Sequence, residues 1–151
     1  MDILRELLAN KILISGICGW TVAQVLKLII HSVVTKDFSI ERLFGDGGMP
    51  SGHSATVSAM ATASYMIYGR GSFEFAVTVM LAIIVMHDAM GVRLETSKQA
   101  VVINQMVDLI RNMGKKIDLE EKLKEFVGHT PIQVVAGSLL GILVGVLVNM
   151  Q

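Results

Sequence analysis

Four runs of apolar residues dominate the chain, and they occupy residues 12–30, 54–68, 73–92 and 131–150. A helix of about 20 apolar residues crosses the roughly 30 Å hydrocarbon core of a bilayer, so these runs predict membrane helices. The second run is shorter and rich in Ala and Ser, and it also fits a helix that packs inside the protein without reaching both membrane surfaces. The pattern therefore predicts an all-α fold, a polytopic membrane helix bundle with about four membrane-embedded helices.

The polar connections between these runs carry the charge pattern that orients such a bundle. Residues 31–50 and 94–130 form two long connections, and residues 69–72 form a tight turn. With four crossings, both long connections lie on one side of the membrane, which holds Lys36, Arg42, Lys98, Arg111, Lys115, Lys116, Lys122 and Lys124. The opposite side holds Arg5, Lys11 and Arg70. Because basic residues favour the cytoplasmic side, we expect the long connections in the cytoplasm and both termini outside.

The connection at residues 94–130 contains a helix signal of its own. Residues 118–121, Asp-Leu-Glu-Glu, are typical of a capping box, and one helical stripe then holds Leu119, Leu123, Phe126 and Val127. We expect an amphipathic cytoplasmic helix here, which lies on the membrane surface or covers a functional site. The chain is then a single domain, residues 1–151, with residues 94–130 as a cytoplasmic helical insertion.

Composition agrees with a membrane protein and excludes other classes. Hydrophobic residues make up 52% of the chain and charged residues 17%, and the mean hydropathy is +0.60. The formal net charge is zero, so no basic field indicates a nucleic-acid partner. The single cysteine, Cys18, cannot form an intramolecular disulfide. A cleaved signal peptide is an alternative for the first run, but no small-residue cleavage site follows it and Lys27 interrupts it.

A glycine-rich stretch at residues 47–54, Gly-Gly-Met-Pro-Ser-Gly-His-Ser, leads into the second apolar run. A helix that begins near Pro50 has free backbone N–H groups at its first turn, where they can bind an anion. Ser51 adds a hydroxyl donor, Gly52 allows a close approach to the backbone, and His53 adds an acid or base. The stretch predicts an anion site beside a histidine. The alternative is an ordinary glycine-proline turn with a serine cap.

A second histidine stands before the last apolar run, in Gly-His-Thr-Pro-Ile-Gln at residues 128–133. Thr130 and Gln133 fit a capping box around a helix that begins at Pro131. Alternatively, Gln133 lies one helical turn from His129 and accepts its imidazole N–H, which fixes the ring nitrogen that is free to react. The two interpretations are compatible with each other.

Several ionisable residues lie inside or at the ends of the apolar runs. Such residues are costly in hydrocarbon and usually face a polar cavity or pair with one another, and here they are Lys27, His87, Asp88 and Arg93. Gln24 and Lys27 share one helix face through their i, i+3 spacing. The alternative for Lys27 and Arg93 is snorkelling toward the membrane surface.

Glycine recurs every four residues in the last run, at Gly137, Gly141 and Gly145. Small residues at this spacing allow the close approach of another helix. The partner is either a helix of the same chain or the same helix of a second copy, which would form a homodimer.

Two stretches of the sequence resemble signatures of the type 2 phosphatidic acid phosphatases, a superfamily related to the vanadium haloperoxidases. Residues 50–53, Pro-Ser-Gly-His, resemble its second signature, and residues 129–137 resemble the second half of its third signature. Residues 47–54 and 88–93, together with Gln99, are more similar to the divergent bacterial and plant branch. The resemblance spans roughly residues 20 to 145.

This resemblance implies a phosphatase without metal or cofactor, in the plasma (inner) membrane, whose site faces the cytoplasm. His129 is implied as the nucleophile that attacks phosphorus, His53 as the general acid for the leaving oxygen, and Gln133 as their catalytic partner. Phosphate binding is implied for Ser51, Gly52, Lys27, Arg93 and Arg42, and polar support for Asp88, Gln99 and Asn104. The implied substrate is a membrane lipid phosphate or a prenyl diphosphate.

Gln133 stands where the family usually has an acidic residue, and this favours an alternative function. The chain is then a catalytically inactive protein that binds lipid phosphates or assists membrane assembly. A haloperoxidase is a poorer hypothesis, because four apolar runs fit a lipid substrate better than a soluble oxidant.

Overall fold

The protein is a bundle of α-helices, and the computed structural model describes residues 2–36, 48–114, 122–123 and 128–150. These residues form no strand, and their helices are α1 (Asp2–Ala9), α2 (Lys11–Thr35), α3 (Gly52–Tyr68), α4 (Phe73–Met90), α5 (Val92–Asn112) and α6 (Pro131–Asn149). The predicted all-α fold is confirmed. The four apolar runs correspond to α2, α3, α4 and α6, with ends that differ from the prediction by a few residues.

Local sequence sets where these helices begin. Asn10, Ser51 and Ser72 are the N-caps of α2, α3 and α4, and each side chain accepts a hydrogen bond from the backbone three residues on. Pro131 stands in the first turn of α6, where its missing N–H costs no helical hydrogen bond.

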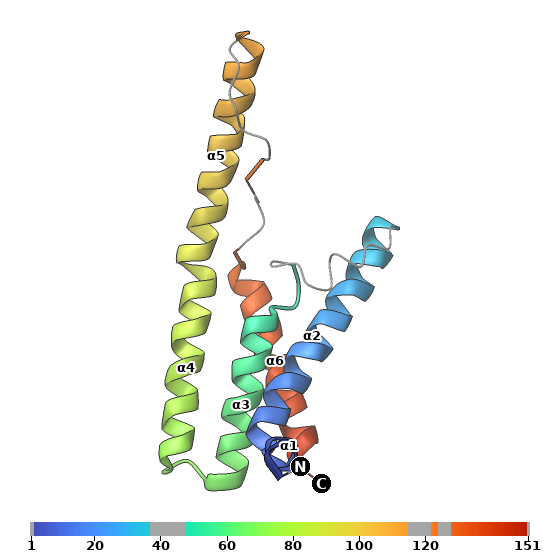
Figure 1. Cartoon of the computed structure of the whole chain (residues 1–151), viewed down its shortest axis with the longest axis vertical. Coiled ribbons are helices and arrows are strands. Elements are labelled where there is room, and N and C mark those ends of the chain that lie inside the picture. Colours follow the sequence, from blue (N-terminus) through green and yellow to red (C-terminus); the bar gives the residue numbers. More distant parts are fainter. Residues whose placement is uncertain (1, 37–47, 115–121, 124–127, 151) are drawn as a thin grey trace.

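Helix α3 lies at the centre of the bundle and packs against α2, α4 and α6 (Figure 1). Its inner positions are small, so the neighbouring backbones come very close to it. A Cβ atom added at Gly19 of α2 would lie 2.8 Å from the carbonyl oxygen of Ala55. On α6, Gly137 and Gly141 lie even closer to the α3 backbone, and a Cβ at Gly145 would lie 2.8 Å from Thr62 Cβ.

The glycine stripe of α6 therefore packs against α3 within the same chain, where all three glycines are buried. The sequence left open whether a helix of the same chain or of a second copy packs on these glycines, and in the structure it is α3 of the same chain. A homodimer through Gly137, Gly141 and Gly145 stays a prediction, and it would require α3 to move away from α6.

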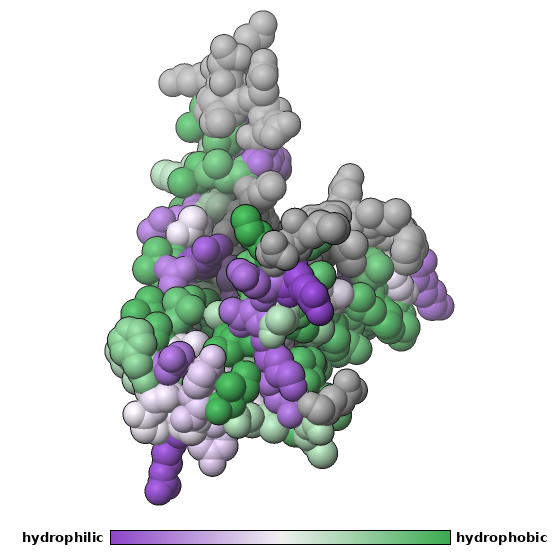
Figure 2. Space-filling view, turned by 60° about the horizontal axis from the view of Figure 1, so that its bottom comes forward, coloured by the Kyte–Doolittle hydropathy of each residue, from purple (hydrophilic) through white to green (hydrophobic). Residues whose placement is uncertain are grey.

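Among the described residues, three stretches of helix are long and apolar enough to cross a membrane: Lys11–Thr35, Phe73–Asn112 and Pro131–Asn149. The second of them combines α4 and α5. With 17 residues, α3 is too short to be counted with these spans. It packs between them, as expected for a short helix rich in Ala and Ser that lies inside the protein. Large apolar side chains are exposed along α2, α4 and α6, and apolar residues cover the flanks of the bundle in Figure 2.

Both termini lie at one end of the bundle, whereas α3 and α6 begin at the opposite end (Figure 1). Helix α5 continues the line of α4 beyond that opposite end. Of the described residues in the predicted insertion, 94–130, those up to Asn112 belong to α5. The helix predicted from residue 118 lies outside the described residues, apart from Lys122 and Leu123, which are not helical.

Candidate functional site

His53 and His129 face each other at the end of the bundle where α3 and α6 begin. Their ring centroids are 5.7 Å apart, and the ring planes meet at 66°. His129 is 1% exposed, whereas His53 is partly exposed. The fold thus brings together the two histidines that the sequence places in separate motifs.

Backbone hydrogen bonds hold both motifs in place. The N–H of His129 donates to the carbonyl oxygen of Ala89 at 3.0 Å, which ties the residue before α6 to the last turn of α4. The N–H of Ser51 donates to the carbonyl oxygen of Gln133, also at 3.0 Å. The relative position of the two imidazoles is therefore set by main-chain contacts.

Gln133 contacts one ring nitrogen of His129 and orients the ring. The backbone N–H of Thr130 donates to Gln133 Oε1 at 3.1 Å, so the oxygen of this amide faces the start of α6. The same oxygen lies 3.2 Å from His129 Nδ1. An oxygen without a proton can only accept, and Nδ1 must therefore carry the hydrogen. In the neutral ring, the lone pair is then on Nε2, and the same Gln133 oxygen serves both the capping box and the contact with His129.

The N-terminus of α3 is buried beside this pair. Ser51 and Ser54 have no exposed surface, and Ser51 Oγ accepts from Ser54 N at 3.4 Å and from Ser54 Oγ at 3.1 Å. Because Ser51 Oγ accepts both bonds, its own proton can be donated elsewhere. The first N–H groups of the helix and its dipole favour a negative charge at this end.

Two polar side chains of α2 reach the same region. Lys27 and Gln24 are each 7% exposed. A Cβ at Gly48 would lie 3.4 Å from the Lys27 stem, and one at Gly52 would lie 4.0 Å from Gln24 Cδ. Gln24 Oε1 is buried, and no described residue donates a hydrogen bond to it. Gln24 was not predicted for the site, although its i, i+3 spacing from Lys27 indicated a shared face.

The other predicted site residues are placed as follows. Arg93 Nε forms an ion pair with Asp88 Oδ2 at 2.8 Å, and both side chains are more than a third exposed. The Arg93 backbone lies against Gly128, next to His129. Gln99 is exposed on α5. Arg42 lies outside the described residues.

Helix α5 holds the segment that leads to His129. Asn104 donates through Nδ2 to the Leu123 carbonyl oxygen at 2.9 Å and accepts from Leu123 N at 3.0 Å. Gly128 N donates to Ser97 Oγ at 3.0 Å. Asn104 is 5% exposed and contacts a residue that precedes His129 in the chain, and its support of the site stays a prediction. Ser97 and Gly128 were not predicted, because nothing in the sequence links them.

Acidic residues and sulfur ligands do not gather at this site. Within the described part of the chain, no group of three or more His, Cys, Asp and Glu residues could hold a metal ion. The arrangement instead offers two imidazoles that face each other and buried hydrogen-bond donors. These groups suit the binding and transfer of an anionic group.

Comparison with known proteins identifies the family of the chain. Residues 8–144 match the family described as the Divergent PAP2 family. The "Uncharacterized membrane protein YuiD" of Bacillus subtilis (strain 168) is 40% identical over 147 residues, which cover 91% of this chain and 93% of that protein. No solved structure matches the chain significantly. The spans and this relative show an integral membrane protein, and the family match over most of its length shows that the chain belongs to the Divergent PAP2 family.

Proposed function

We propose that this protein is a metal-independent membrane phosphatase, which hydrolyses a lipid phosphate or prenyl diphosphate through a phosphohistidine at His129. The observation that carries the proposal is the histidine pair, with ring centroids 5.7 Å apart at the buried start of α3. Its site faces the cytoplasm in this proposal, which places it beside lipids of the inner leaflet of the plasma membrane.

In the first step, Nε2 of His129 attacks phosphorus and the bond from phosphorus to the leaving oxygen breaks. His53 donates a proton to that oxygen, so an alcohol leaves from a phosphate monoester, or the prenyl monophosphate leaves from a prenyl diphosphate. The Nδ1–H of His129 stays hydrogen-bonded to Gln133 Oε1, 3.2 Å away. In the second step, water attacks phosphorus, His53 takes its proton, and the P–N bond breaks to release inorganic phosphate.

The phosphate oxygens need donors and positive charge while this transfer takes place. The N–H groups at the start of α3, the Ser51 hydroxyl and Lys27 supply them in this proposal. Gln24 is the further observation that supports a ligand here, since its amide is 7% exposed and Oε1 has no donor among the described residues. Such an acceptor suits a protonated phosphate oxygen. Arg93 joins these groups when it releases Asp88, and Arg42 is a further candidate.

The second candidate function is a lipid-phosphate-binding protein without turnover, and Gln133 favours it. A neutral amide at this position does not stabilise the positive charge that His129 acquires as the reaction proceeds. In a serine protease, the corresponding change from carboxylate to amide lowers kcat by about 10⁴. This alternative predicts that phosphate binding survives when His129 is replaced, with no hydrolysis at any pH.

Release of inorganic phosphate by the detergent-purified protein tests the proposal. The substrates are a panel of lipid phosphates and prenyl diphosphates in EDTA, and wild type is compared with His129→Ala. His31→Ala is the matched control, because it removes an imidazole on α2 that is outside the pair. We expect release by wild type and the control and none by His129→Ala. Equal inactivity of wild type and His129→Ala over the whole panel and pH range would exclude the enzyme.

The roles of the two histidines can be separated by the leaving group. A nitrophenolate leaves without protonation, so His53→Ala should hydrolyse p-nitrophenyl phosphate far better than an alkyl phosphate. His129→Ala should be inactive on both, because it lacks the nucleophile. A His53→Ala variant that loses both activities equally would show that His53 is not the general acid.

A further inference from the structure

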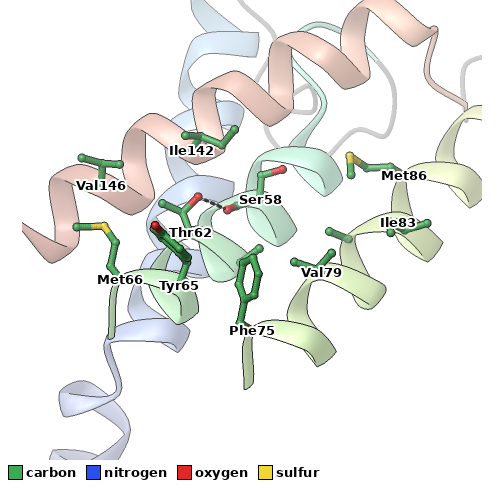
Figure 3. A pocket seen from close by; sticks show the side chains of 12 residues that line it. Ser58, Thr62, Tyr65, Met66, Phe75, Val79, Ile83, Met86, Ile142 and Val146 are labelled. Carbon is green, nitrogen blue, oxygen red and sulfur yellow. Dashed lines mark hydrogen bonds between the residues drawn. The ribbon is translucent and has the colours of Figure 1, made fainter. Parts of the chain in front are cut away.

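An apolar groove of about 600 Å³ lies between α3, α4 and α6 (Figure 3). Three of its lining residues carry hydroxyl groups, namely Ser58, Thr62 and Tyr65, and the others are apolar. The Thr62 hydroxyl donates to the Ser58 carbonyl oxygen at 2.8 Å, so it is used within α3. No charged residue is among the described residues that line the groove. Its walls therefore suit hydrocarbon and offer nothing to a charged headgroup.

One end of this groove lies directly beneath the histidine site. Met86 lines the groove and precedes, by less than one helical turn, Ala89, whose carbonyl oxygen accepts from His129 N. On α3, Ser58 lies one turn below Ser54, which is hydrogen-bonded to Ser51. Both helices thus place the groove about 5 to 6 Å along the helix axis from the site.

The far end of the groove is marked by the rings of Tyr65 and Phe75, whose centroids are 5.6 Å apart. From Ser54 to Tyr65 the rise of α3 is about 16 Å. The hydrocarbon core of a bilayer is roughly 30 Å thick, so this length corresponds to about one leaflet.

The flanks of the groove are apolar surface that faces outward. Ile84 on α4 is 60% exposed and Leu139 on α6 is 64% exposed. In an integral membrane protein such side chains contact lipid, so a groove between these two helices is continuous with the lipid phase. A lipid can therefore bring its chain in sideways while its headgroup stays at the site end.

We propose that this groove binds a hydrocarbon chain of the substrate, a lipid of the leaflet on the site side, whose phosphate reaches His129. The inference rests on the proposed function and gives it a substrate class. The enzyme then prefers phosphates with a long apolar chain over short or soluble ones, because the groove recognises only the chain.

Filling the groove tests this preference. Ile83 lines it and is 53% exposed, so Ile83→Trp adds bulk there without replacing a core side chain. Ile84→Trp is the matched control on the next residue, which does not line the groove. We expect Ile83→Trp to raise KM for a long-chain alkyl phosphate by about tenfold or more and to leave phenyl phosphate hydrolysis unchanged. Equal effects on both substrates, or equal effects of the two variants, would overturn the proposal.

A second experiment separates the groove from the chemistry. An alkyl phosphate with a diazirine at the end of its chain is photolysed with the inactive His129→Ala protein, and the labelled residues are mapped. We expect labels on Tyr65, Met66 or Phe75 that unlabelled alkyl phosphate displaces. Labels elsewhere, or identical labelling by the corresponding alkyl alcohol, would show that the groove does not bind the substrate chain. If wild type releases no phosphate but these labels appear, the phosphatase fails and the chain site stands.

Discussion

The backbone N–H of Ser51 donates a hydrogen bond to the carbonyl oxygen of Gln133 at 3.0 Å. This bond joins the residue that caps α3 to the first turn of α6. Since His53 follows Ser51 and His129 is hydrogen-bonded to Gln133, a shift of one helix along the other would change the distance between the two imidazoles. The site is therefore sensitive to the packing of α3 on α6.

Gly137→Ala should disrupt this packing, because its Cβ would meet the carbonyl oxygen of Ser51 closer than real Cβ atoms approach. Overpacking of this kind costs about 1–3 kcal/mol, so we expect a lower thermal midpoint of the detergent-purified protein and a loss of phosphatase activity. Gly71→Ala is the control, since a Cβ there meets nothing within 4 Å. A Gly137→Ala protein as stable and active as the control would contradict the close contact.

Gln133→Leu should leave the N–H of Thr130 and Nδ1–H of His129 without their acceptor. A buried donor without a partner costs about 1–3 kcal/mol, which corresponds to a loss of activity of roughly 5- to 150-fold. Gln133→Glu keeps an acceptor for both and adds a negative charge beside the imidazole. We expect it to hydrolyse at least as fast as wild type, as kcat measurements would show. Full activity of the leucine variant would mean that Gln133 does not orient His129.

Asn104→Ala should loosen the segment before His129, because both hydrogen bonds to the Leu123 backbone are lost. We expect faster amide hydrogen exchange at Leu123 and Gly128, by about tenfold or more, and a lower kcat. Gln99→Ala changes an exposed amide on the same helix and should leave both quantities unchanged. If Asn104→Ala and Gln99→Ala show the same amide exchange rates at Leu123 and Gly128, Asn104 does not hold the residues before His129.

The orientation in the membrane can be measured with single cysteines, because Cys18 is the chain's only one. In a Cys18→Ala background, Gly71→Cys and Lys98→Cys place thiols at exposed positions of the α3–α4 turn and of α5. If the site faces the cytoplasm, an impermeant maleimide should label the first in intact cells and the second only after permeabilisation. The reverse pattern would place the site outside.

Helix positions were predictable where a long apolar run and a cap coincide. Ser72 and Pro131 both stand at such boundaries, and the structure begins α4 and α6 there. Helix α5 was missed as a defined element. Its buried positions, Ser97, Ala100 and Asn104, are small or polar. Ser97 and Asn104 hydrogen-bond Gly128 and Leu123, which do not belong to a helix.

Contacts between residues that are far apart in the sequence were harder to predict than the helices. The spacing of Gly137 and Gly141 indicates close packing but carries no information on which helix comes close. Similarly, the two signatures predicted His53 and His129 as a pair, and the structure brings these rings together. Gln24 was not predicted as a site residue, because its spacing indicated a face shared with Lys27 but not that this face is buried beside Gly52.

The close packing of α3 against α6 limits when the site can form during synthesis of the chain. Ser54, Ser58 and Ser64 are buried in α3, a helix with much of its surface turned away from lipid. Its partner α6 follows α3, α4 and α5 in the chain, so α3 is synthesised well before the helix that packs most extensively against it. Because His53 lies in α3 and His129 directly precedes α6, the two imidazoles can come together only after α6 has packed against α3.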